Sequence, residues 1–244
     1  MILIFTIVAA IVLVIGGIVT LVVRSARKRR EAVAALACEM GFEAVKEADL
    51  AKRDGLATLP LFAKKGLCAS NIIQGSVSGL KTALFDYVRV DGEGDVMVRE
   101  EHTVVAFESP RGGLPVFRIQ RKKSWSFSLG REIEINPEFG RAFRLTGKNE
   151  ADIRKTFNAA LAQFLMSENV PQHWQIEGGG PWLIFWTHRM EPRDWHEFMN
   201  KTCVIADGFF RHCGSAAPSV APSEGSSTRS SKISLSEWSR VTAE

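Results

Sequence analysis

The longest apolar run in the chain stands at its start. Residues 2–23 contain no charged side chain, and 16 of these 22 residues are Ile, Leu, Val or Phe. A helix of about 20 apolar residues spans the hydrocarbon core of a bilayer. The run therefore predicts a transmembrane helix over residues 1–23. It is too long for the apolar part of a cleaved signal peptide and has no basic segment before it.

Five basic residues follow the apolar run within seven positions, and we call them the basic collar: Arg24, Arg27, Lys28, Arg29 and Arg30. Lys and Arg are enriched on the cytosolic side of membrane helices. This asymmetry predicts a single-pass protein with its amino terminus outside and its body in the cytosol. We expect the collar to contact anionic lipid head groups, which adds up to about 1 kcal/mol for each charge.

Helical periodicity continues beyond the collar. Val33, Leu36, Ala37 and Met40 recur at helical spacing, and Gly41 is a typical helix stop. The pattern predicts a basic stalk helix over residues 24–41 that leads into a globular domain over residues 42–213. A short helix is expected within residues 47–57.

The next part of the chain alternates apolar and polar positions, which is typical of strands. We expect strands at residues 69–77, 80–90, 96–108, 115–121 and 124–129. Ser78-Gly79 is a two-residue hairpin signal, and an acidic turn is expected over residues 91–95. The spacing of the turns predicts an antiparallel meander.

The second half mixes helix and strand signals. We expect a short helix from Asn136, a strand at 142–146, a helix capped by Asn149 that continues to Leu165, strands at 173–177 and 182–188, and a last helix from Pro192 or Arg193. Gly178–Gly180 is expected to be the turn between the last two strands. The predicted class is α+β, a meander followed by β-α-β-β-α, with helices on one face of an antiparallel sheet. A division of this domain is possible near residues 130–136.

The carboxyl-terminal segment has a different composition. Ten of the 31 residues in 214–244 are Ser, and large apolar residues are few. Such a segment buries too little apolar surface to compensate for the entropy lost on ordering. We therefore predict that residues 214–244 form a disordered tail.

The charge balance excludes an extended basic surface of the kind that binds nucleic acid. The chain has 31 Lys and Arg against 27 Asp and Glu, a net charge of +4. Without the 5 residues of the collar, 26 basic residues face 27 acidic ones, a net charge of −1. The excess positive charge therefore belongs to the collar, and the body has no general basic character.

Sequence motifs for cofactors and metals are missing. The four cysteines form no C-x-x-C pair, and the five histidines form no H-E-x-x-H pattern. There is no phosphate-binding G-x-x-x-x-G-K-[ST] loop either. We therefore predict neither a metal site nor a cofactor, and expect reduced, buried thiols.

One group of residues is a weak candidate for catalysis. His188, Asp194 and His196 lie within nine positions, between a predicted strand end and a predicted helix start. A cluster of this kind could serve a hydrolase, although solvated or capping side chains are the ordinary interpretation. Whether the protein is an enzyme is left open by the sequence, with the balance against it.

Several short blocks between about Leu61 and Phe210 carry a family resemblance. They are Phe85-Asp86-Tyr87 with Thr103-Val104-Val105; Asn136–Phe139, Phe143-Arg144-Leu145, Gly147, Arg154, Phe157 and Phe164-Leu165; and Trp174, Glu177-Gly178 and Trp182-Leu183. Together they are similar to a group of uncharacterised bacterial membrane-anchored proteins. The resemblance implies a bacterial inner-membrane protein, and it carries over no catalytic residues. Many members have a glycine-lysine-rich hairpin where this chain has acidic residues at 92–95.

Three functional hypotheses follow from these patterns. The first is a membrane-anchored cytosolic binding or scaffolding module with a protein partner or lipid head groups as its ligand. The second is a hydrolase-like enzyme that uses His188, Asp194 or His196. The third is a structural subunit of a bacterial envelope complex, with the apolar helix as its contact.

Overall fold

The computed structural model describes residues 2–46, 50, 55–56, 59–62, 68–91, 98–122 and 131–214, with the side chains of residues 2–11 and of residue 91 excepted. Several expectations fall wholly or mainly outside this part of the chain. They are the short helix within 47–57, the acidic turn at 91–95, the strand at 124–129 and the tail.

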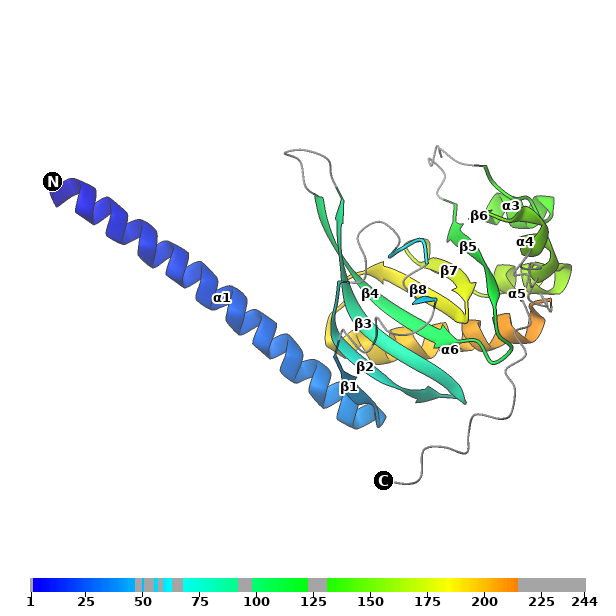
Figure 1. Ribbon diagram of the computed structural model, residues 1–244, viewed down its shortest axis with the longest axis horizontal. Helices are drawn as coiled ribbons and strands as arrows, with labels where there is room; N and C mark the ends of the chain where they lie inside the picture. The colour runs from blue at the N-terminus through cyan, green and yellow to red at the C-terminus, as the bar shows by residue number, and fades with distance from the viewer. Residues whose placement is uncertain are drawn as a thin grey trace, which may run out of the picture.

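One eight-stranded antiparallel sheet organises the body (Figure 1). Its strands are β1 (Glu43–Val45), β2 (Ala69–Val77), β3 (Leu80–Asp91), β4 (Val98–Glu108), β5 (Leu114–Arg121), β6 (Phe143–Gly147), β7 (Gln175–Gly180) and β8 (Trp182–His188). They lie in the order β1-β2-β3-β4-β8-β7-β5-β6. The predicted α+β class is confirmed.

The predicted meander is confirmed for β2 to β4 and wrong for β5. β4 pairs with β8, whereas β5 pairs with β6 and β7. The β7–β8 hairpin therefore lies between β4 and β5. Residues 102–107 of β4 are buried on both faces of the sheet, so the backbone of β4 needs a strand at each edge. Because β5 pairs with strands that follow residues 130–136, the sheet does not divide there.

Two hairpin turns show how local sequence sets the pairing. Ser78 and Gly79 both have positive φ, 51° and 81°, which is the primed turn that matches strand twist. The second hairpin differs from its prediction, because Gly178 and Gly179 belong to β7 and pair with β8. A Cβ at Gly178 would lie 2.2 Å from Cε1 of Phe117, so glycine is needed there for close packing within the strand.

The helices are α1 (Ile2–Met40), α3 (Pro137–Ala142), α4 (Glu150–Thr156), α5 (Ala159–Ser167) and α6 (Trp195–His212), with a 3-10 turn, η2 (Pro192–Asp194), before α6. The single helix predicted from Asn149 is in fact two. Phe157 leaves the helical conformation, and the side chain of Asn158 accepts a hydrogen bond from the Leu161 amide. Asn158 thus starts a second helix, because asparagine is among the strongest N-cap residues.

Helix α1 continues from the apolar run into the body and ends where Gly41 was expected to stop it. Gly41 has φ +66°. The Phe42 amide donates to the Ala37 carbonyl at 2.8 Å, and the Gly41 amide to the Cys38 carbonyl at 3.2 Å. These two bonds form a Schellman motif. Because the described backbone is helical from Ile2 to Met40, no loop separates the apolar run from the body.

The sheet separates two apolar cores. The helix-covered core joins the end of α1, represented by Val33 and Leu36, to α6 and to the inner face of the sheet. On the opposite face, Leu59 and Phe62 of the segment before β2 pack on Phe85. All five of these residues are buried. The helical layer is therefore on one face, as predicted, while described residues of the segment before β2, such as Leu59 and Phe62, cover part of the other.

Candidate functional site

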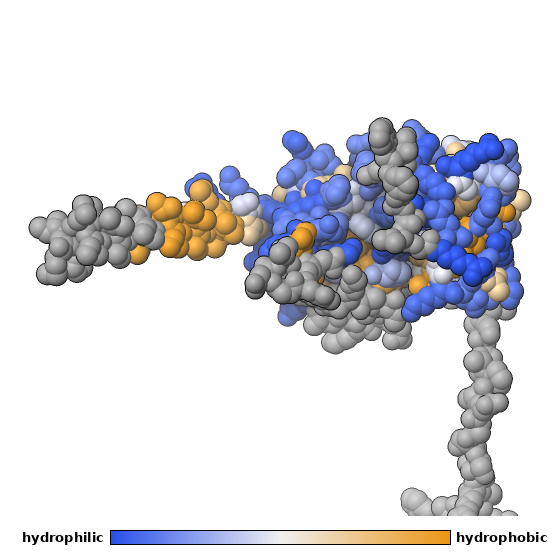
Figure 2. Space-filling view, turned by 90° about the horizontal axis from the view of Figure 1, so that it is seen from above, coloured by the Kyte–Doolittle hydropathy of each residue, from blue (hydrophilic) through white to orange (hydrophobic). Residues whose placement is uncertain are grey.

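The first half of α1 projects from the body as an exposed apolar rod. Side chains between Val12 and Val23 are exposed by 55% or more wherever they are large and apolar, and they form the orange projection in Figure 2. Among the described residues, no helix has both the length and the apolar run needed to cross a bilayer. The side chains of residues 2–11, which open the predicted span, lie outside that set.

The basic collar lies where the rod meets the body. Arg24, Arg27, Lys28 and Arg30 are solvent-exposed. Arg27 forms an ion pair with Glu31 one turn along the helix, with 2.8 Å between Nε and Oε1. Both partners are mostly exposed, and such a pair contributes about 0–1 kcal/mol. These four side chains remain available to a ligand at the surface.

Arg29 differs from the rest of the collar because it is buried in the body. Its Nε and Nη2 donate to the two carboxylate oxygens of Asp86, each at 2.7 Å. Nη2 also donates to the Met190 carbonyl at 2.7 Å, and the guanidinium carbon lies 5.6 Å from the ring centre of Trp195. The predicted lipid contact of Arg29 is therefore replaced by an intramolecular one, since its position on α1 faces the sheet.

Asp86 is the centre of this arrangement. It also accepts a hydrogen bond from Nδ2 of Asn71 at 2.7 Å, and Oγ1 of Thr103 lies 3.5 Å from its other oxygen. Thr103 in turn accepts from the Met190 amide at 2.9 Å. We call Arg29, Asn71, Asp86, Thr103 and Met190 the Arg29 cluster. It ties α1 to β2, β3, β4 and the segment before η2, and both charges are paired, as burial requires.

A break in the β2–β3 register helps to build the cluster. The pairing shifts between Ser70 and Ile73, and Asn71 has φ +52°. Asparagine tolerates this left-handed conformation better than most residues. The resulting bulge brings the Asn71 amide group to Asp86, and bulges are common where a side chain must be redirected.

Sequence reasoning missed the Arg29 cluster, although one signal was present. Asp86 is the only charged residue in the run Ala83–Val88, and the other residues of that run are apolar or aromatic. A lone carboxylate in a buried strand indicates a buried partner. The partner itself was not predictable, because Arg29 precedes Asp86 by 57 positions.

A second buried carboxylate lies on the opposite face of the sheet. Glu177 of β7 is fully buried and accepts hydrogen bonds from the Leu61 amide at 2.8 Å, Nε of Arg118 at 2.7 Å and Nε1 of Trp186 at 3.1 Å. Burial raises the pKa of Glu177, against the lowering effect of Arg118 and the other donors. The hydroxyl of Tyr87 donates to the Leu61 carbonyl. Glu177 thus holds the segment around Leu61 on the sheet.

A buried histidine lies on the same face. His102 of β4 is 3% exposed, and its ring packs edge-on to Trp186 at 4.8 Å. Nδ1 lies 3.3 Å from the Thr187 carbonyl. Nε2 makes no hydrogen bond within the described part of the chain, and Oε2 of Glu100 lies 3.5 Å from it. Burial lowers the pKa of His102, and the Thr187 carbonyl and Glu100 oppose this shift.

The lowered pKa of His102 predicts that the folded state loses stability in acid. A histidine whose pKa is lower in the folded state binds protons more readily when unfolded, so stability is lost as the pH falls through about 6.5 and below. Replacing His102 by Phe should reduce the loss of unfolding free energy between about pH 7.5 and about pH 5, measured by urea titration. His196→Gln, at an exposed position, is the control and should follow the wild-type curve. Identical pH curves for His102→Phe and wild type would contradict the assignment.

The three candidate catalytic residues are on different elements. His188 ends β8, Asp194 belongs to η2 and His196 lies in the first turn of α6. Within the described residues, no hydrogen bond or ion pair joins any two of them. Asp194 lies 3.8 Å from Arg193, and Nε2 of His196 contacts Asn200 at 3.4 Å. The structure therefore does not bring this group together as a site.

The four cysteines differ in their exposure to solvent. Cys203 is buried, Cys213 is half-buried, and Cys38 and Cys68 are exposed. The expectation of buried thiols is therefore confirmed for Cys203 and wrong for Cys38 and Cys68. The described residues contain no group of three His, Cys, Asp or Glu side chains arranged to hold a metal ion.

Comparisons with known proteins give one distant likeness. No family model and no curated protein matches the chain. Among solved structures, the crystal structure of the mycobacterial trehalose monomycolate transport factor A, TtfA, is similar with a TM-score of 0.48 and 16% sequence identity, covering 76% of this chain and 94% of that chain.

Proposed function

We propose that this protein is a membrane-tethered binding or scaffolding module of the bacterial inner membrane. In this proposal residues 2–23 insert into the bilayer with the amino terminus outside, and the sheet faces the cytosol, where it binds a partner protein. The observation that carries the proposal is the continuity of α1. One helix passes from the uncharged run through the exposed collar to the buried Arg29 cluster.

The energetics of the apolar run support insertion. Its 16 Ile, Leu, Val and Phe residues contribute on the order of −5 to −10 kcal/mol on the biological insertion scale. The collar then places four exposed cations at the cytosolic interface, where anionic lipids attract them. In this proposal the buried Arg29 has a different role from the four exposed cations, because it sets the orientation of the body relative to the membrane.

The test is membrane retention of the full-length protein. The double variant Leu13→Asp, Ile18→Asp introduces two carboxylates into the apolar run, each costing about 2.5–3.5 kcal/mol at the centre of a membrane helix. This cost is comparable to the whole insertion energy, so the variant should move from carbonate-washed membranes to the soluble fraction. Val204→Asp is the matched control, because Val204 is also an exposed apolar residue, 58% exposed, but lies on α6. Wild-type protein released by carbonate would contradict the tether.

The orientation can be measured with native thiols. Cys38 and Cys68 are exposed on the body side of the collar. With the body in the cytosol, a membrane-impermeant maleimide should label neither cysteine in intact cells and should label them after permeabilisation. Labelling in intact cells would place the body on the outer side of the membrane.

A further inference from the structure

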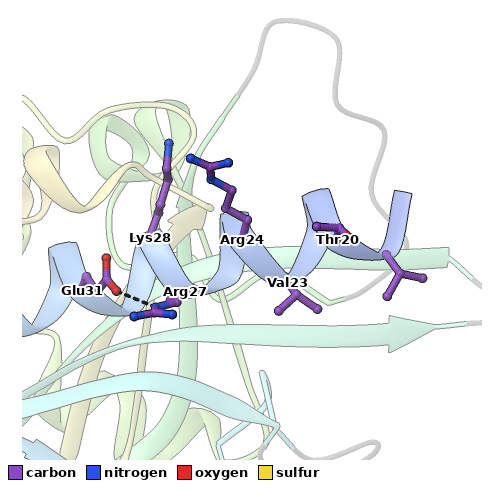
Figure 3. Close-up of a pocket in the computed structure, with 7 residues that line it drawn as sticks. Thr20, Val23, Arg24, Arg27, Lys28 and Glu31 are labelled. Atoms are coloured by element: carbon purple, nitrogen blue, oxygen red, sulfur yellow. Dashed lines mark hydrogen bonds and ion pairs between the residues drawn. The ribbon is translucent and has the colours of Figure 1, made fainter. Parts of the chain in front are cut away.

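A hollow of about 350 Å³ opens between the end of α5 and the middle of α6, and we call it the α5–α6 hollow. Two elements build it, since part of its lining follows α5 and part lies on α6: Glu168, Asn169, Pro171, Trp174, Lys201, Val204 and Ile205. A hollow beside the collar is built differently, because the residues that line it, from Val19 to Glu31, all lie on α1 (Figure 3). The α5–α6 hollow can therefore enclose a side chain from two sides.

Hydrogen bonds hold the wall that follows α5 in place. Nη1 of Arg121, on β5, donates to the Val170 carbonyl at 3.0 Å and to Oδ1 of Asn169 at 3.4 Å. The Val170 amide donates to the Glu168 carbonyl at 2.8 Å. The wall is thus fixed to the sheet before any ligand binds, and such preorganisation lowers the entropic cost of binding.

The lining of the hollow is partly aromatic and apolar. Trp174 is buried and packs edge-on against Phe198 of α6 at 4.9 Å, and Ile205 is buried beside it. Val204, by contrast, is 58% exposed. Among the described residues outside α1, Val204 and Val98 are the large apolar side chains that remain exposed. An apolar lining with a few polar groups is typical of ligand pockets, and a volume of about 300 Å³ or more is sufficient for one.

Two opposite charges flank this lining. Nζ of Lys201 lies 2.5 Å from Oε1 of Glu197 one turn away, and both side chains are mostly exposed. Such a pair contributes about 0–1 kcal/mol, so Lys201 can exchange Glu197 for the carboxylate of a ligand at little cost. Glu168 forms no ion pair within the described part of the chain. The hollow therefore suits a short segment in which a large apolar side chain lies between an acidic and a basic residue.

The last described residue, Gly214, lies one helix length from this hollow. Its amide donates to the Thr156 carbonyl at 3.0 Å, and Nδ2 of Asn158 donates to the His212 carbonyl at 2.9 Å. These bonds place Gly214 at the start of α5, whereas the hollow lies at the end of α5. With 9 residues, α5 is about 14 Å long.

A segment with the required pattern follows within reach. Of the five large apolar residues in 214–244, Val220 stands alone and the other four lie close together: Ile233, Leu235, Trp238 and Val241. Trp238 has Glu237 before it and Arg240 two positions after it. Residues 215–232 precede the group, and a chain of this length rich in small polar residues has a root-mean-square span of about 21–25 Å. This span exceeds the length of α5.

We propose that residues 233–240 dock in the α5–α6 hollow of the same chain. Trp238 packs against Val204 and Trp174, Glu237 pairs with Lys201, and Arg240 lies near Glu168. While the segment is bound, the hollow is closed to any other peptide of the same pattern, so the segment acts as a built-in competitor. The proposal does not depend on the membrane tether.

A labelled peptide tests the proposal on the full-length protein in detergent. The probe is a fluorescein-labelled peptide of residues 229–242, and its binding is measured by fluorescence anisotropy. A linker of this length gives an effective concentration of about 1 mM, so a segment with a Kd of about 0.1 mM would be bound about ten times as often as free. Trp238→Ala frees the hollow and should therefore bind the peptide about tenfold more tightly than wild type.

Two matched pairs of variants locate the effect. In the Trp238→Ala background, Val204→Asp should abolish peptide binding, while Val98→Asp, at an exposed apolar residue of β4, should leave it unchanged. Within the carboxyl-terminal segment, Val220→Ala should bind the peptide as weakly as wild type, because Val220 lies outside the proposed docking segment. Circular dichroism should show the same helix content in all variants.

Three results would overturn the proposal. Equal peptide affinities for wild type and Trp238→Ala would show that the segment does not occupy the hollow. Undiminished binding after Val204→Asp would place the peptide elsewhere, on the detergent micelle or on another surface. A difference between wild type and Trp238→Ala that disappears on dilution of the protein would assign the hollow to the segment of a second copy.

Discussion

Replacing Asp86 by Ala should lower the free energy of unfolding by about 3–5 kcal/mol, because the substitution leaves the charge of Arg29 buried without its carboxylate. Arg29 would keep only its bond to the Met190 carbonyl, and the amide group of Asn71 would lose its acceptor. The effect can be measured by urea titration of the full-length protein in detergent, followed by tryptophan fluorescence.

A matched control separates this effect from charge removal in general. Glu31→Ala breaks the exposed pair with Arg27 on the same helix and should cost about 0–1 kcal/mol. The double variant Arg29→Met, Asp86→Leu removes both buried charges and should lose less stability than Asp86→Ala alone. Equal losses for Asp86→Ala and Glu31→Ala would show that the Arg29 cluster does not hold α1 to the sheet.

Replacing Phe117 by Ala should have an effect of similar size, about 3–5 kcal/mol, because it opens a cavity in the helix-covered core. Phe117 is fully buried, lies edge-on to Phe157 at 4.9 Å and stacks on Phe209 at 5.7 Å. Its ring therefore joins β5 to the end of α4 and to α6. Denaturant titration of the full-length protein measures the loss.

The Phe117 ring also explains why residue 178 is a glycine. Comparing Gly178→Ala in the wild-type and Phe117→Ala backgrounds tests this explanation. A Cβ at Gly178 would overlap the Phe117 ring, so Gly178→Ala alone should cost about 1–3 kcal/mol by overpacking. In a Phe117→Ala background the added methyl group enters the cavity, and the substitution should cost little or be stabilising. Additive losses in the double variant would mean that Gly178 is required for its backbone conformation and not for packing.

The elements governed by local signals were predictable. The Ser78-Gly79 hairpin, the Asn136 cap of α3 and the stop at Gly41 each depend on residues within a few positions of one another. Such interactions can be read from sequence, because turn and cap geometry restricts which residue types fit. Phe198 and Cys203 are buried on α6 for a reason that is also local, since helical spacing fixes which residues share one face.

Strand order and buried polar partners were not predictable in this way. Alternation places Phe107 inward without indicating that β4 pairs with β8, because every antiparallel strand with one buried face has a similar pattern. Arg29 looked like a member of a solvated basic run, and Glu177 looked like an ordinary polar position before a turn. Both are buried because partners distant in sequence, Asp86 and Arg118, meet them across the fold.

The position of Arg29 on α1 has a further consequence for how the protein meets others. Arg29 follows Val23 by six residues, which is about 9 Å along the helix. With the proposed tether, the sheet edge near β2 would stand within a head-group layer of the hydrocarbon and would keep a constant height. A partner anchored in the same membrane would meet that edge during lateral diffusion in two dimensions, whereas a partner from the cytosol would reach it only by diffusion in three dimensions. The height of this sheet edge above the membrane, which six residues of helix set, would then determine which partners reach it.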